Sequence, residues 1–108
     1  MKIKSFEQDG VTVIQVSGEI NISSSPELRK LLEKEQKKKM VIDFEKVTYI
    51  DSSGLATLVE VLKRSKTQGG FLGLAALSDK VKSLFEITKL DKLFSIFENL
   101  KDAIKSAQ

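Results

Sequence analysis

The pattern of apolar and polar positions at the start of the chain predicts a β-hairpin. Segments 2–7 and 11–18 flank the dipeptide Asp9-Gly10, which favours the positive backbone angles of a tight hairpin turn. In the second segment, Val13 and Ile14 place apolar side chains on opposite faces of the strand. We therefore expect the second strand to be covered on both sides.

A polar connection, 18–25, leads into a segment with helical spacing. Pro26 suits the first helical turn, where its missing N–H is not needed, and Ser25 is then the expected N-cap. The helix carries leucines at i, i+3 and i+4 and ends in the basic cluster 33–39. This cluster contains no aromatic residue, so we interpret it as a solvated helix end and not as a nucleic-acid site.

Apolar runs rich in strand-forming residues alternate with further helical patterns. Runs 40–44 and 71–77 are typical of buried parallel strands, and 93–97 of a short edge strand. Helical spacing fills the intervals; Ser78 with Asp79 is expected to cap one of these helices, and Asn99 another. The predicted order is β-β-α-β-α-β-α-(β)-α. It implies a single α/β domain, 1–108, with a small mixed sheet of four to five strands and about four helices.

Composition narrows the possible functions. The 108 residues contain neither cysteine nor histidine, which removes thiolate and imidazole metal sites and histidine-based nucleophilic triads. We therefore expect no enzyme, no metal and no cofactor. The net charge is only +3, and no apolar run approaches the ~18 residues of a membrane helix. The start of the chain lacks the apolar centre of a signal peptide, so a cytoplasmic protein is expected.

The stretch TYIDSSGLATL, 48–58, combines an acid, two hydroxyls and a glycine immediately before a helical pattern. A catalytic serine is not supported, because the chain has neither a histidine base nor the G-x-S-x-G motif of a nucleophile elbow. A nucleotide site is not supported either, because the sequence contains no phosphate-binding loop motif. A serine N-cap explains one hydroxyl, but Gly54 costs a helix up to ~1 kcal/mol and is expected to give another surface access. A further reading is that a serine here is phosphorylated, which adds negative charge without disturbing the fold.

The chain resembles the STAS-domain family of bacterial anti-sigma-factor antagonists. The resemblance covers nearly the whole sequence and is carried by VSGEIN at 16–21, VIDFEKVTYIDSSGLATLV at 41–59, GG at 69–70 and VKSLFEITKLDKLFSIF at 81–97. The signature D-S-[ST/A]-G-[LV] is matched by the segment 51–55. The resemblance implies that the chain is a partner-switching regulator of transcription, with a small mixed sheet backed by helices.

The resemblance also implies partners and a switch. The unmodified antagonist binds a GHKL-type serine-kinase anti-sigma factor, which phosphorylates the serine after the aspartate, here Ser52, and a PP2C-like phosphatase reverses the modification. The expected partner surface comprises Asn21, Ser23, Asp51, Ser53, Gly54 and Leu55. Asn21 stands where the family often has aspartate, so one charge is lost there.

Other hypotheses remain open at this point. Ser24 and Ser25 join Ser23 as further candidate phosphorylation sites in the same loop. The alternative function is a STAS scaffold subunit of a transport or sensory assembly that does not switch. A binder of nucleotides or other small ligands at the helix start is a third hypothesis.

Overall fold

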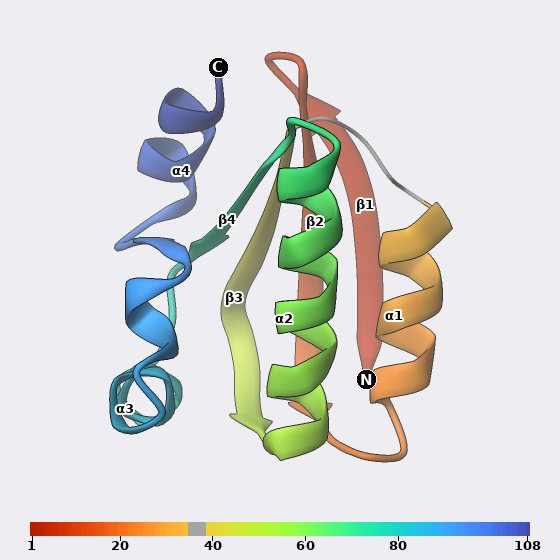
Figure 1. Cartoon of the computed structure of the whole chain (residues 1–108), viewed down its shortest axis with the longest axis vertical. Coiled ribbons are helices and arrows are strands. Elements are labelled where there is room, and N and C mark those ends of the chain that lie inside the picture. Colours follow the sequence, from red (N-terminus) through yellow and green to blue (C-terminus); the bar gives the residue numbers. More distant parts are fainter. Residues whose placement is uncertain (35–38) are drawn as a thin grey trace.

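The sheet has five strands in the order β1-β2-β3-β4-β5 in the computed structural model, which describes residues 1–34 and 39–108 (Figure 1). β1 (Lys2–Gln8) and β2 (Val11–Ile20) form the predicted antiparallel hairpin. Its turn residues, Asp9 and Gly10, have φ angles of 54° and 78°. Two consecutive positive φ angles are what a two-residue hairpin turn requires, so the prediction from this dipeptide is confirmed.

The remaining strands pair in parallel, each next to the strand before it in the sequence. They are β3 (Lys39–Ile50), β4 (Phe71–Ala75) and β5 (Ser95–Phe97). Parallel neighbours need crossover connections, and helices α1 (Ser25–Lys34), α2 (Ser52–Thr67) and α3 (Asp79–Ile87) supply them. A 3₁₀ turn, η1 (Leu90–Lys92), precedes β5, and α4 (Leu100–Ala107) ends the chain. The predicted order of elements and the mixed sheet are confirmed.

Helices cover both faces of the sheet. The crossover helices pack on one face, where Ile14 and Val16 of β2 join the larger core cluster. α4 packs on the other face with Val11 and Val13 of the same strand. The expected burial of β2 on both sides is therefore confirmed, because alternate residues of a strand point to opposite faces.

Two strands are longer than the apolar runs indicated. β3 continues from the predicted 40–44 run to Ile50, and β2 continues to Ile20 through what we expected to be a polar connection. The two extensions pair with each other, with register irregularities between Gln15 and Ser17 and between Gly18 and Glu19. Hydrogen bonding between the two backbones therefore extends both strands into segments whose side chains are too polar to predict a strand from the sequence.

Helix caps were predicted well in the C-terminal half. The Ser78 hydroxyl accepts a hydrogen bond from the Val81 N–H at the start of α3. The Asn99 side chain does the same for the Asp102 N–H at the start of α4. Both caps are as expected, with Ser78 as the residue that caps α3.

α1 and α2 lie side by side across the sheet (Figure 1), joined by two ion pairs between their outer surfaces. Arg29 reaches Glu60 at 2.7 Å, and Arg64 reaches Glu33 at 3.1 Å. Part of the basic cluster that we interpreted as a helix end, 35–38, lies outside the described residues. Among the described residues, no helix is long and apolar enough to cross a membrane.

Candidate functional site

Asp51 joins the end of the sheet to the start of α2. Its N–H donates to the Ile20 carbonyl at 3.0 Å, which continues the pairing of β3 with β2 by one bond. Its Oδ1 accepts hydrogen bonds from the N–H groups of Ser53 (3.0 Å) and Gly54 (3.1 Å). Asp51 is therefore the N-cap of α2, and the expectation that a serine fills this position is wrong.

Ser53 is held on two sides. Its hydroxyl donates to Asp51 Oδ1 at 2.5 Å and lies 3.2 Å from the Ser25 hydroxyl at the start of α1. The side chain is half-buried. Ser53 therefore links the starts of two helices, and its hydroxyl is already committed to contacts within the chain.

The Asp51 carboxylate is stabilised in its charged form. The hydrogen bond from the Ser53 hydroxyl is the main reason that its pKa lies below the ordinary value of 3.8. Backbone N–H groups of Gly54, Ile22 and Ser53 lower this pKa further, against an opposing effect of desolvation. At neutral pH the site therefore carries a fixed negative charge directly beside Ser52.

Ser52 contrasts with its neighbour. It is the first residue of α2, its side chain is exposed, and its hydroxyl makes no hydrogen bond within the described part of the chain. It lines a shallow groove of about 450 Å³ between α2 and the α3–η1 segment, with Leu55, Thr88 and Leu90 among the lining residues. The hydroxyl is thus available to another molecule.

A second groove lies on the other side of the α2 start. It has a volume of about 380 Å³ and is lined by residues of α1 and α2 together with Ile22. Ile22 is an isoleucine exposed over 75% of its surface, in a loop that is otherwise polar. Ile22 therefore adds an exposed apolar side chain to the edge of this groove.

Gly54 does not open the surface as we expected. It is buried, and a Cβ atom at this position would lie 2.7 Å from Ile20 Cγ2 and 2.7 Å from Ile50 Cγ1. The missing side chain lets α2 approach the ends of β2 and β3 closely. The glycine therefore serves the packing of the helix against the core and gives no exposed patch of its own.

The loop 21–25 is fastened to Asp51 through its backbone. The Ile22 N–H donates to Asp51 Oδ2 at 3.1 Å, so one carboxylate holds both the helix start and the loop. Asn21 Oδ1 accepts from the N–H groups of Ser23 (2.9 Å) and Ser24 (3.1 Å). An aspartate can accept both bonds in the same way, but it cannot replace the bond that Asn21 Nδ2 donates to Glu19 Oε1 at 3.4 Å.

The serines of this loop have different roles. Ser25 was expected to cap α1, but it is the first helical residue, and its hydroxyl donates to the Asn21 carbonyl at 2.6 Å. The Ser24 hydroxyl donates to the Glu19 carbonyl at 2.9 Å. Ser23 is exposed, with no side-chain hydrogen bond among the described residues. Of the predicted site residues, Asn21, Ser23, Asp51, Ser52, Ser53, Gly54 and Leu55 all lie at the end of the sheet where β2 and β3 finish.

The fold and this arrangement define a class of protein. The sequence matches the STAS domain family over residues 2–103, and the chain belongs to that family. Within it, the chain is 39% identical over 96 residues to the anti-sigma-B factor antagonist of Bacillus subtilis (strain 168), covering 87% of this chain and 86% of the relative. It is 31% identical over 101 residues to the anti-sigma-B factor antagonist of Staphylococcus aureus (strain NCTC 8325 / PS 47), covering 91% and 94%.

Structural comparison agrees with the sequence comparison. The crystal structure of an anti-sigma factor antagonist from Mycobacterium paratuberculosis superimposes with a TM-score of 0.89 and 28% sequence identity, covering 98% of this chain and 92% of the other. The family resemblance recognised in the sequence is confirmed.

Sequence reasoning missed three features of the site. It did not foresee the bond from Ile22 to Asp51, the contact between Ser25 and Ser53, or the contribution of Thr88 and Leu90 to the groove beside Ser52. Only Ile22 carried a readable signal, as a lone aliphatic residue in the polar loop. The other two depend on how distant segments meet in space.

Proposed function

We propose that this chain is an anti-sigma-factor antagonist, a binding module that is switched by phosphorylation at Ser52. The observation that carries the proposal is the contrast between two adjacent serines. Ser53 is half-buried and bonded to Asp51 and Ser25, whereas Ser52 is exposed at the mouth of a groove and free of such bonds within the described residues. The curated relatives named above, which are anti-sigma-B factor antagonists, support the antagonist part of the proposal.

The partner in this proposal is a serine-kinase anti-sigma factor of the GHKL type. Its contact surface on this chain comprises Asn21 and Ser23 in the loop and Asp51 and Ser53 at the start of α2, with Ile22 as an exposed apolar contact. Leu55, also expected on this surface, is largely buried and contributes only to the lining of the groove beside Ser52. Gly54 supports this surface from below by fixing the distance between α2 and the sheet. In this proposal the chain is the substrate that provides the Ser52 hydroxyl, and the kinase catalyses the transfer of the phosphoryl group.

Phosphorylation changes the charge of the surface more than its shape. A phosphoryl group adds about −1.5 to −2 charges at pH 7. At Ser52 it would sit at the positive end of the α2 dipole, which favours an anion, and beside the Asp51 carboxylate, which concentrates negative charge there. We infer that the fold stays intact after phosphorylation. A partner surface that tolerates the single negative charge of Asp51 would be repelled by the added charge of the phosphate.

The first experiment locates the phosphate. The purified chain is incubated with ATP and, one at a time, the serine-kinase anti-sigma factors of the host, and the modified residue is mapped by mass spectrometry. Wild type and Ser53→Ala are expected to gain one phosphate at Ser52, whereas Ser52→Ala gains none. A PP2C-like phosphatase is then expected to remove it. Phosphorylation of Ser52→Ala at the wild-type rate would show that the acceptor is another residue.

The second experiment measures binding of the same kinase to Ser52→Asp and Ser52→Ala. The aspartate variant is expected to bind more weakly with an unchanged far-UV spectrum, and the alanine variant to bind like wild type. If no kinase modifies Ser52 and the unmodified protein binds none of them, the non-switching STAS scaffold becomes the better description.

A further inference from the structure

The groove beside Ser52 extends along α2, away from the start of the helix. Ser52, Val59 and Lys63 line it at helical spacing, so they share one face of α2 over roughly 16 Å. Its other side comes from the segment that joins α3 to η1, through Thr88 and Leu90. The groove therefore connects the Ser52 hydroxyl with the end of α3.

The lining of this groove is mainly apolar. Val59 and Leu90 are half-buried and pack against the main core cluster. Glu60 and Lys63 are its charged lining residues, and the Glu60 carboxylate is paired with Arg29 of α1 at 2.7 Å. The groove therefore leaves two aliphatic side chains partly exposed, with little charge around them.

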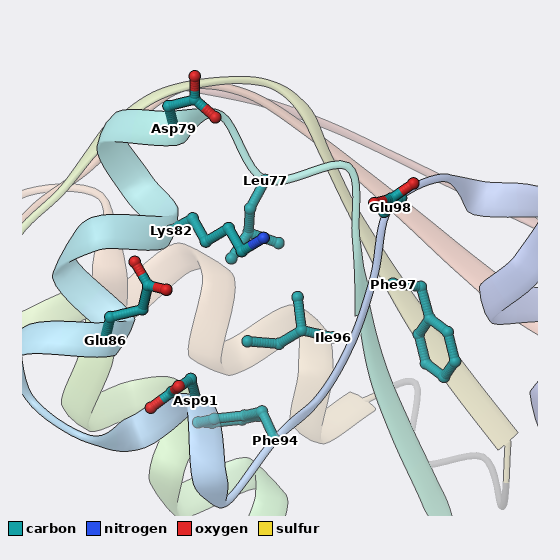
Figure 2. Close-up of a pocket in the computed structure, with 9 residues that line it drawn as sticks. All are labelled: Leu77, Asp79, Lys82, Glu86, Asp91, Phe94, Ile96, Phe97 and Glu98. Atoms are coloured by element: carbon teal, nitrogen blue, oxygen red, sulfur yellow. The ribbon is translucent and has the colours of Figure 1, made fainter.

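The opposite flank of α3 has a different character. A cavity of about 470 Å³ lies there, between α3, η1 and β5, and its described lining residues do not overlap with those of the groove. Figure 2 shows the Lys82 side chain extending across this cavity. Charged groups surround it, namely those of Asp79, Lys82, Glu86, Asp91 and Glu98. Since charged side chains are costly to dehydrate, an apolar contact with another protein is favoured on the flank of α3 that faces α2.

Phosphorylation of Ser52 places a kinase on this groove. The Ser52 oxygen must come within about 3–3.5 Å of the γ-phosphorus of ATP; the new P–O bond forms as the bond to ADP breaks, and the hydroxyl proton is released. Ser52 lines the groove on the α3 side of α2, whereas Ser53 lines the groove on the α1 side. A stable interface covers about 800 Å² on each partner, so a kinase that reaches Ser52 also covers the groove that begins there.

We propose that the kinase that modifies Ser52 places an apolar segment of its own surface in the groove between α2 and the α3–η1 segment. This inference rests on the function proposed above and adds the end of α3 to the partner surface. Thr88 and Leu90 then determine how tightly the kinase holds this chain, without touching the reacting atoms. Ile87, exposed over 76% of its surface, adds a further apolar side chain at the end of α3.

The test compares two matched threonines. Thr88 and Thr67 are both exposed, and each hydroxyl donates to the carbonyl four residues earlier, at 2.7 Å and 2.9 Å. Thr67 lies at the far end of α2 from Ser52 and lines neither groove. The same serine kinase phosphorylates each full-length variant at saturating ATP. Thr88→Arg is expected to raise KM about five- to twentyfold with kcat within about twofold of wild type, and Thr67→Arg to leave both unchanged.

Two further variants separate the effect on docking from an effect on folding. Thr88→Val removes the same hydroxyl without adding a charge, so its KM should stay within about twofold of wild type. Val59→Thr makes the groove more polar at nearly constant volume and is expected to raise KM about two- to fivefold. The midpoint of urea denaturation shows that each variant is folded, and Val59→Thr takes the place of Thr88→Arg if the latter is not.

The outcomes distinguish this inference from the function on which it rests. If the kinase modifies wild-type Ser52 and the KM values of Thr88→Arg and Thr67→Arg agree, the groove is not the docking surface, although the switch at Ser52 stands. A fall in kcat at unchanged KM would also overturn docking, because the groove would then act on the transfer step. If no serine kinase of the host modifies wild-type Ser52, both the proposed function and this inference fail.

Discussion

The Gly54→Ala substitution tests how the switch region is attached to the core. The added Cβ would lie 2.7 Å from side-chain carbons of Ile20 and Ile50 and 3.1 Å from the Ile20 carbonyl oxygen. Both isoleucines are buried, with exposures of 0% and 1%, so neither can move away into solvent. The helix must therefore shift outward, or the ends of β2 and β3 must give way.

Two opposing effects set the magnitude. Overpacking of a well-filled core costs about 1–3 kcal/mol, and the contacts on two buried side chains and a carbonyl place this site in the upper half of that range. Alanine is a better helix former than glycine, by up to about 1 kcal/mol. The expected net loss is therefore about 1–2 kcal/mol, or roughly 4 °C in Tm for each kcal/mol in a domain of this size.

Urea denaturation followed by circular dichroism measures this loss. Ala56→Gly, at an exposed position of the same helix, is the control for helix propensity and is expected to cost up to about 1 kcal/mol. In an Ile20→Ala background, which removes one of the two close carbons, the cost of Gly54→Ala should shrink. A Gly54→Ala protein more stable than wild type would refute the packing explanation, since a gain in stability is what helix propensity alone predicts.

Three further predictions concern the polar contacts. Ser53→Ala should raise the pKa of Asp51 toward 3.8, as followed by NMR of the carboxyl carbon; because the folded pKa is lowered, this carboxylate stabilises wild type above pH 3.8, and the stabilisation is lost as pH falls through the lowered pKa. Asn21→Asp keeps the acceptor bonds of the loop but replaces the bond to Glu19 with two neighbouring carboxylates, so its free energy of unfolding should fall by up to about 1 kcal/mol in urea denaturation. Glu60→Gln weakens its exposed ion pairs with Arg29 of α1 and with Arg64 of the same helix and should cost less than about 1 kcal/mol by the same assay, with a difference that shrinks in high salt.

Short-range sequence signals predicted most of the fold. The Asp9-Gly10 turn, the caps at Ser78 and Asn99, and the two-sided burial of β2 each depend on a few neighbouring residues, and the structure contains all of them. The ends of β2 and β3 were missed because backbone pairing between segments about thirty residues apart sustains them, with little apolar patterning.

The candidate site was predicted in its residues but not in its connections. Asp51 was expected beside a serine cap, yet its carboxylate is the cap, because it reaches the N–H groups of Ser53 and Gly54 together. Local preference allows either residue type at this position. The Ile22 N–H donates a hydrogen bond to Asp51 Oδ2 and so helps to orient this carboxylate as the cap. This bond comes from a loop that is distant in sequence, so local patterns could not predict it.

The use of Asp51 as the cap has a consequence for a phosphate at Ser52. Helix starts commonly bind phosphate through free N–H groups of the first turn. Here the N–H groups of Ser53 and Gly54 donate to the Asp51 carboxylate, and that of Leu55 donates to the Asp51 carbonyl. A phosphoryl group on Ser52, beside the groove that this residue lines, would therefore find these three donors already taken. Its charge would then be favoured by the α2 dipole but not neutralised by hydrogen bonds from these groups, so it would remain available to change the affinity of a partner.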